Sequence, residues 1–113
     1  MIGIDLQEVE KIKDPEKLLD KIALQSEKDY IAKYKCGFKM RVATLWALKE
    51  AVFKALGVRE GEISFKEIEL VHKESGEPYV NLFGKALKCL NGRKIEVSIS
   101  HQQSVVGAVA IVV

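Results

Sequence analysis

The residues from Phe38 to Leu56 form the longest helix-like stretch of this chain, and Gly57 marks its end. Its apolar residues occupy more than one helical face and are Val42, Leu45, Trp46, Ala47, Leu48, Ala51, Val52, Phe53, Ala55 and Leu56. A helix that is hydrophobic nearly all round is usually covered by other elements on both sides. In a chain of 113 residues this predicts a single domain, residues 1–113, built around one central helix.

Shorter elements are expected on either side of this helix. Asp14 can cap a helix in which Pro15 takes the first position, and Ser26 can start another that runs from Glu27 to about Tyr34. Alternating or apolar runs predict strands over 68–72, 79–83, 95–100 and 105–113, with a β-like start at 2–6 and a short helix over 85–90. The expected fold class is α+β, with a small antiparallel sheet wrapped on the long central helix.

Composition and charge exclude several classes of protein. A net charge of +2 gives no reason to expect a nucleic-acid partner. No apolar run approaches the ~20 residues that span a bilayer, and the amino terminus lacks the basic region of a signal peptide. Cys36 and Cys89 lie outside any metal-ligand or C-x-x-C cluster, so free thiols are expected rather than a disulfide or a metal site. We therefore expect a cytoplasmic protein with no membrane partner.

Two groups of charged residues are candidates for chemistry. Asp5 follows a hydrophobic strand start, where a carboxylate can bind a hard cation or simply be solvated. Glu50 and Lys54 are four residues apart and therefore neighbours on a helix, where a surface ion pair is the simpler interpretation. They lie, however, within a run of Trp, Ala, Leu, Val and Phe. A carboxylate flanked by Lys49 and Lys54 suits a metal ion that bridges phosphates.

The third candidate is the sequence from Ser98 to His101. If this strand alternates, Ser98 and Ser100 share a face and His101 begins the following turn. Hydroxyl groups and an imidazole at a strand end can bind a phosphate, although a capping or structural role for His101 is the alternative. A serine hydrolase would need an acid partner and a nucleophile on a sharp turn, and it is disfavoured because there is no G-x-S-x-G motif.

Taken together, the chain resembles the 4′-phosphopantetheinyl transferase superfamily, and in particular its short acyl-carrier-protein synthase branch. The pattern of that branch has a G-x-D near the amino terminus, a W/F-x-x-K-E-A-x-x-K-A-x-G helix in the middle and an S-x-S-H strand end. Here these motifs are Gly3-Ile4-Asp5, Trp46 to Gly57, and Ser98 to His101. Their order and spacing match, so the resemblance covers nearly the whole chain.

The resemblance implies a magnesium-dependent enzyme of fatty acid biosynthesis. It would transfer 4′-phosphopantetheine from coenzyme A to a serine of an apo-acyl carrier protein and release 3′,5′-ADP. Asp5 and Glu50 match the magnesium ligands of the family, and Lys54 would help to offset the charge that develops on the phosphate oxygens. The serine proton could go to a metal-bound water, to Glu50 or to Asp5, and the sequence does not decide between them.

The resemblance also implies a binding site for coenzyme A. Lys54 and Lys49 match lysines near the phosphates, and His101 with Ser100 matches the part of the family site that meets the 3′-phosphate. The turn at Gly76, Glu77 and Pro78 resembles the family's G-x-P turn beside the adenine. Short members of the family form homotrimers with active sites between subunits, which suits a chain too small to bury a large core.

An acidic carrier protein would dock on a basic first helix. The candidates are Lys11, Lys13, Lys17, Lys21 and Lys28, although interspersed acidic residues leave a merely solvated helix as the alternative. Two departures from the family pattern concern arginines. Lys11 precedes Ile12 where an arginine is common, and a lysine lacks the bidentate fork of a guanidinium. Leu45 stands where many members carry an arginine, and Arg41 lies one helical turn earlier as a possible replacement.

Two other classes of function fit the sequence less well. A nucleic-acid-binding module would need a dense basic face with stacking aromatic residues, and Tyr30 and Tyr34 belong to no RNA-binding signature. A catalytically inactive protein of the same fold need not keep Asp5, Glu50, Lys54 and His101 together. The retained set favours the enzyme.

Overall fold

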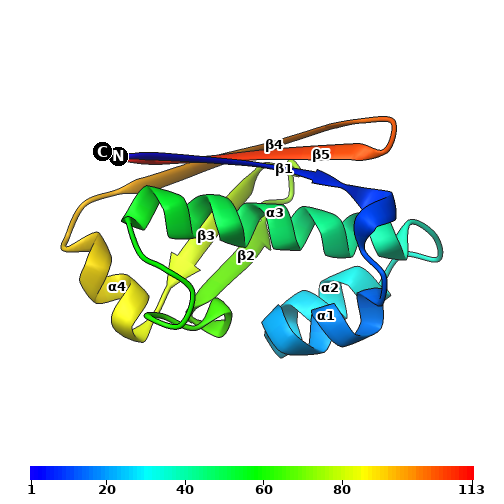
Figure 1. Ribbon diagram of the computed structural model, residues 1–113, viewed down its shortest axis with the longest axis horizontal. Helices are drawn as coiled ribbons and strands as arrows, with labels where there is room; N and C mark the ends of the chain where they lie inside the picture. The colour runs from blue at the N-terminus through cyan, green and yellow to red at the C-terminus, as the bar shows by residue number, and fades with distance from the viewer.

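The computed structural model describes residues 1–113 and places one long helix at its centre. Helix α3 (Phe38–Leu56) ends at Gly57, whose backbone adopts the left-handed conformation that glycine tolerates best. A sheet covers one side of α3, and shorter helices with a hairpin cover the other (Figure 1). This arrangement confirms the expectation that a helix apolar on several faces is buried between two layers.

The layer above α3 in Figure 1 is an antiparallel sheet of three strands. Its members are β1 (Ile2–Glu8), β5 (Val105–Val112) and β4 (Ile95–Gln102), in the spatial order β1-β5-β4. The first and last strands of the chain are therefore direct neighbours, and the two termini lie side by side. Val106, Ala108 and Ala110 of β5 are buried, so this face of the sheet is in the core.

The layer below α3 contains the remaining elements. They are α1 (Pro15–Ile22), α2 (Gln25–Ala32), the 3-10 turn η2 (Phe65–Glu67), the hairpin of β2 (Ile68–His72) and β3 (Pro78–Leu82), and α4 (Gly84–Leu90). The 3-10 turn η1 (Val9–Lys11) leads from β1 past the start of α3 toward α1. The predicted α+β class with antiparallel strands is confirmed. The five strands divide into two sheets, of three and two strands. None of the helices has the length and apolar character needed to cross a bilayer.

The helix starts follow local hydrogen bonding. The Asp14 side chain accepts a bond from the Lys17 amide (3.1 Å), as a residue that caps a helix should. Helix α2 begins at Gln25, slightly before the predicted start at Glu27. The reason is that the Glu27 carboxylate accepts the Leu24 amide (2.8 Å), so the helix needs no serine cap.

Strand β1 lies unusually close to α3 because of Gly3. A Cβ atom at this position would overlap the carbonyl oxygen of Ala51, the amide nitrogen of Ala55 and the Cβ of Lys54. Only glycine allows two backbones to approach in this way. The glycine of the G-x-D motif therefore brings β1 into direct contact with the helix that carries the K-E-A-x-x-K motif.

Candidate active site

Asp5 and Lys54 are in contact across the interface between β1 and α3. Side chains alternate along a strand, so Asp5 points toward α3 as Gly3 does, while Ile4 points outward. The Lys54 ammonium donates to Oδ1 of Asp5 (3.1 Å) and to the carbonyl oxygen of Ile4 (2.9 Å). The Asp5 side chain is 17% exposed and that of Lys54 is 52% exposed, so the lysine can be reached from solvent.

Glu50 lies one helical turn before Lys54 and is half-buried. Burial raises the pKa of its carboxyl group above the usual range, and the nearby carboxylates of Asp5 and Glu60 raise it further. The charges of Lys54 and Lys21 oppose this change without reversing it. The structure thus brings Asp5, Glu50 and Lys54 together, in a place where negative charge is in excess.

This cluster fits a magnesium ion that is bound together with a phosphate substrate. No group of three or more Asp, Glu, His or Cys side chains surrounds a metal-sized site anywhere in the chain. Magnesium, however, is usually held by one or two carboxylates plus waters and substrate phosphates rather than by an all-protein cage. The Asp5 charge raises the pKa of Glu50, and a divalent cation held by these carboxylates would favour the ionised form of Glu50.

The structure does not place Lys49 with these residues. Its side chain is fully buried, and its ammonium donates to the Ile22 carbonyl (2.7 Å), the Glu27 carboxylate (2.8 Å) and the Phe65 carbonyl (3.0 Å). An ammonium group has three protons, and all three are in use. The prediction that Lys49 binds coenzyme A phosphates is therefore wrong in this structure. Consecutive helical residues point about 100° apart, so Lys49 faces the core while Glu50 faces β1.

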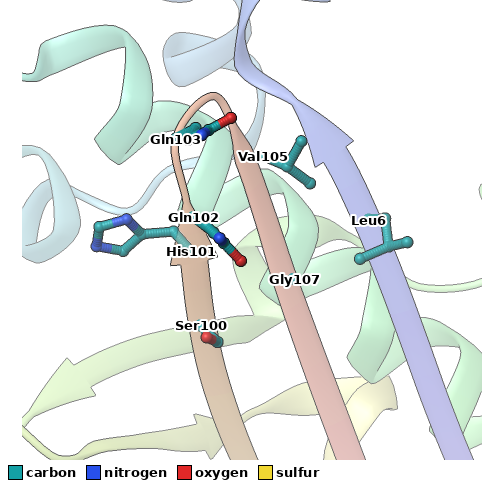
Figure 2. Close-up of a pocket in the computed structure, with 7 residues that line it drawn as sticks. All are labelled: Leu6, Ser100, His101, Gln102, Gln103, Val105 and Gly107. Atoms are coloured by element: carbon teal, nitrogen blue, oxygen red, sulfur yellow. The ribbon is translucent and has the colours of Figure 1, made fainter.

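Ser100 and His101 lie near the end of β4, but their side chains point to opposite faces of the strand (Figure 2). His101 is within β4 and does not begin the turn, contrary to the prediction. Both residues border an open hollow of about 410 Å³ at the β4–β5 turn. The hollow is lined by Leu6, Ser100, His101, Gln102, Gln103, Val105 and Gly107. A single ligand group cannot sit between the two side chains, although a larger ligand at this strand edge can meet both.

On the α3 side, His101 borders a second cavity of about 170 Å³, which also contains Arg41 and Leu45. The Nε of Arg41 is buried without a hydrogen-bond partner, while its guanidinium carbon lies 3.5 Å from the centre of the Tyr34 ring. Arg41 is the cation of this cavity and has an unused donor. That donor suits an acceptor from outside the protein, such as a phosphate oxygen.

The wall of this cavity includes His72 and Tyr30, which belong to none of the three sequence motifs. The His72 and Tyr30 rings are stacked, with centroids 4.3 Å apart. Burial lowers the pKa of His72, and the Arg41 charge lowers it further, so His72 is neutral at neutral pH. The sequence signal was a histidine in an alternating strand, which does not by itself distinguish a site residue from a core residue.

The turn with Gly76 and Pro78 joins β2 to β3. Gly76 has a φ of 92°, a conformation that favours glycine, and Pro78 pairs with His72 across the hairpin. Neither Gly76 nor Pro78 lines the two cavities that His101 borders. Their predicted place beside the adenine stays a prediction.

The register of the sheet relates the acidic cluster to His101. Asp5 pairs with Ala108 of β5, which pairs with Ile99 of β4, two residues before His101. Two strand spacings of about 4.8 Å put β4 roughly 10 Å from β1. Asp5 and His101 lie on the same face of the sheet, which is the face toward α3. One extended ligand can therefore place different phosphates beside these two residues.

Comparison with known proteins assigns this architecture to a family. The model of the 4′-phosphopantetheinyl transferase superfamily matches residues 1–110. The chain is 32% identical over 117 residues to a holo-acyl-carrier-protein synthase of Treponema denticola, covering 98% of this chain and 95% of that protein. It is 37% identical over 120 residues to that of Caldanaerobacter subterraneus, covering 99% of this chain and 93% of the relative.

Solved structures agree with the sequence relatives. The Helicobacter pylori holo-acyl-carrier-protein synthase, solved in complex with coenzyme A, superimposes with a TM-score of 0.85 at 31% identity, over 100% of both chains. The Bacillus anthracis synthase in complex with CoA (3′,5′-ADP) gives 0.84 at 29% identity, covering 98% and 93%. The chain belongs to the 4′-phosphopantetheinyl transferase superfamily. Within it, the chain is an enzyme of the holo-acyl-carrier-protein synthase branch.

Proposed function

We propose that this enzyme transfers 4′-phosphopantetheine from coenzyme A to a serine hydroxyl of an apo-acyl carrier protein, with Mg²⁺ as cofactor. The observation that carries the proposal is the contact of Asp5 and Lys54, with Glu50 beside them, in a chain that matches the superfamily. The choice of carrier protein is supported by the sequence relatives, which are holo-acyl-carrier-protein synthases. The choice of coenzyme A is supported by two similar structures that were solved in complex with it. The product carrier would serve fatty acid biosynthesis.

In this reaction the serine oxygen forms a bond to the β-phosphorus of coenzyme A. The bond from that phosphorus to the oxygen of the α-phosphate breaks, and 3′,5′-ADP leaves with the bonding electrons. Asp5 and Glu50 would hold the magnesium ion, which supplies positive charge at the pyrophosphate when it is bound. Lys54 is exposed enough to exchange its bond with the Ile4 carbonyl for one with a phosphate oxygen.

The serine proton needs an acceptor. Glu50 is our choice between the two carboxylates, because Lys54 already donates a hydrogen bond to Asp5 and none to Glu50. The proton moves from the serine hydroxyl to a Glu50 oxygen as the new O–P bond forms. It then returns to solvent, to which the half-buried Glu50 side chain is open.

The adenosine end of coenzyme A would lie at the edge of β4. We assign its 3′-phosphate to the cavity of His101 and Arg41, because the unpaired Arg41 Nε is the buried donor there. Ser100 borders the neighbouring hollow on the other side of the strand. On this assignment Arg41 would supply the guanidinium that the family pattern has at the position of Leu45.

The acidic carrier protein would dock against the first part of the chain. Several of its lysines are exposed but already face acids: Lys11 lies 3.9 Å from Glu8, and Lys21 lies 3.7 Å from Glu60. Exposed pairs of this kind contribute little to stability and exchange partners easily. An acidic partner can therefore compete for these lysines, with a larger effect on the association rate than on affinity.

The outer face of the three-stranded sheet supports a homotrimer. Ile2, Ile4 and Leu6 of β1 are 67%, 63% and 72% exposed, and Val105 and Ile111 of β5 are also exposed. An apolar sheet face of this kind is typical of an interface between subunits. Because Ser100 shares this face, copies that pack here would complete the hollow at the β4–β5 turn. The thiols of Cys36 and Cys89 are free, which agrees with the proposed cytoplasmic location.

A transfer assay tests the proposal directly. The purified protein is mixed with coenzyme A, Mg²⁺ and an apo-acyl carrier protein, and the mass of the carrier is followed with and without a chelator. A gain of one phosphopantetheine that the chelator abolishes supports both the reaction and the metal. No gain with several carriers, while coenzyme A binding is confirmed by calorimetry, would contradict the proposed function.

A further inference from the structure

Lys49 and Glu27 form an ion pair in the interior of the protein. The Lys49 side chain is 0% exposed, that of Glu27 is 2% exposed, and their charged atoms are 2.8 Å apart. Every polar atom of the pair is used. Besides Lys49, the Glu27 carboxylate accepts the Leu24 amide (2.8 Å) on one oxygen and the Leu70 amide (2.7 Å) on the other.

This pair joins segments from both ends of the lower layer to the central helix. Lys49 belongs to α3 and also bonds the Ile22 carbonyl at the end of α1 and the Phe65 carbonyl in η2. Glu27 belongs to the first turn of α2 and accepts the amide of Leu70, the central residue of β2. Five elements from three separate stretches of the sequence therefore meet at two side chains.

The central helix needs a directional contact of this kind. Helix α3 is apolar on several faces, and apolar packing does not depend on direction, so it fixes the rotation of such a helix only weakly. An ammonium group with three buried acceptors has a defined orientation. Glu50 follows Lys49 by about 100° of helical rotation, and Lys54 lies one turn beyond Glu50. Holding Lys49 therefore holds both active-site residues toward β1.

We propose that Lys49, through its pair with Glu27, is a positioning residue that sets the rotation of α3 and so aims Glu50 and Lys54 at Asp5. The inference rests on the proposed function of these three residues. A buried ion pair seldom stabilises a protein more than well-packed apolar side chains would. A positioning role therefore explains why a charged residue occupies this core position. Lys49 acts through its neighbours and does not touch the substrate.

The test compares Lys49→Met with Val42→Ala. Met keeps an unbranched side chain in the core but cannot bond the three oxygens. Val42 is fully buried in α3, two turns earlier, and its truncation lowers stability without touching the pair. We expect Lys49→Met to lower kcat by about 10- to 100-fold, because misplacing reacting groups by about 1 Å has effects of that order. The KM for coenzyme A should change little, and Val42→Ala should keep kcat at a temperature where both variants are folded.

A second readout does not depend on turnover. Mn²⁺ binding in the presence of coenzyme A, followed by the electron paramagnetic resonance signal of the free ion, should weaken in Lys49→Met and not in Val42→Ala. If Lys49→Met does not fold, Glu27→Gln replaces it, since it keeps the shape and removes the charge. Its expected effects are in the same direction and smaller.

Three results would overturn the inference. A rise in KM with normal kcat would make Lys49 a ligand of coenzyme A, and a loss of stability alone would make the pair purely structural. The third is a crystal structure of Lys49→Met in which Glu50 and Lys54 still face Asp5. Failure of the proposed function looks different, because the unmodified protein would then not modify any carrier.

Discussion

Lys54 and Asp5 are 49 residues apart in the chain, and the Lys54 Nζ lies 3.1 Å from Oδ1 of Asp5. The contact exists because Gly3 lets β1 lie directly on α3. It joins the first and second motifs of the sequence into one site. The two motifs are therefore parts of a single arrangement, in which the glycine, the carboxylate and the lysine depend on one another.

Removal of either carboxylate should abolish transfer. Asp5→Ala and Glu50→Ala each delete one of the two protein oxygen ligands proposed for magnesium, and we expect transfer to fall by on the order of 10²–10³-fold or more. The fold and the proposed trimer should persist, because the Asp5 side chain makes one hydrogen bond and the Glu50 side chain makes none. The carrier mass assay measures the loss. Glu8→Ala, at the exposed end of the same strand, is the control and should stay active; unchanged transfer in Asp5→Ala or Glu50→Ala would contradict the metal assignment.

Glu50→Gln should make the metal-free protein more stable at neutral pH. Because burial and the neighbouring carboxylates raise the pKa of Glu50, the folded protein binds the Glu50 proton more firmly than the unfolded chain does. The contribution of Glu50 to stability is therefore fully present below the ordinary glutamate pKa and is lost as the pH rises through the raised value. Glutamine cannot ionise and avoids this loss. Thermal unfolding in chelator should show a higher Tm for the variant at neutral pH, with the difference vanishing in acid; an equal or lower Tm at neutral pH would argue against the raised pKa.

Replacement of Arg41 should separate recognition of the 3′-phosphate from the chemistry. Arg41→Ala removes the buried guanidinium from the His101 cavity, so we expect kcat/KM for coenzyme A to fall about tenfold or more, a loss typical of one charged hydrogen bond. Activity with coenzyme A that lacks its 3′-phosphate should be the same in both proteins. The two substrates are compared in steady-state kinetics, with Lys39→Ala on the same helix as the control. Equal losses with both substrates would place Arg41 outside the phosphate site.

Gly3→Ala should strongly destabilise the protein. The added Cβ meets backbone atoms of Ala51 and Ala55, which cannot move as a flexible side chain can, so a loss of about 3 kcal/mol or more is expected, at the upper end for overpacking. The measurement is unfolding in denaturant. Gly107→Ala is the matched control, because its Cβ would meet the end of the Leu6 side chain at 3.2 Å, which can turn aside. Similar losses for the two variants would show that β1 is not held tightly against α3.

A charge on the outer sheet face should dissociate the proposed trimer. Leu6 is 72% exposed in a single copy of the chain, so Leu6→Glu should leave the folded subunit intact while opposing burial of this face. Light scattering after size exclusion should give the mass of one chain for the variant and of three for the unmodified protein. Lys94→Glu, outside the apolar face, serves as the charge-changing control. A variant that remains trimeric would place the interface elsewhere.

Much of the fold could be predicted because its strongest signals are local. The range of α3, the strand over 68–72 and the cap at Asp14 follow from periodicity and from residues that begin or end helices. The pairing of β1 with β5 could not be predicted in this way, since it joins the two ends of the chain. The division of the strands into two sheets depends on the same kind of distant contact.

Site residues could be predicted only where they belong to a recognisable sequence motif. Asp5, Glu50 and Lys54 lie together as predicted, although their roles stay proposals. Lys49 was misassigned because adjacent positions in a helical motif point in different directions, and only the structure shows which face is buried. The partner of Lys49, Glu27, lies in another helix and has no motif of its own.

The order of the strands has a consequence for synthesis of the protein. Strand β5 (Val105–Val112) leaves the ribosome after the other four strands, yet it lies between β1 and β4 and is the only partner of β1 in the sheet. Until it arrives, the strand that carries Asp5 has no hydrogen-bonded neighbour to hold it on α3. A nascent chain therefore has no assembled active site, and premature termination before residue 105 should yield fragments that cannot consume coenzyme A.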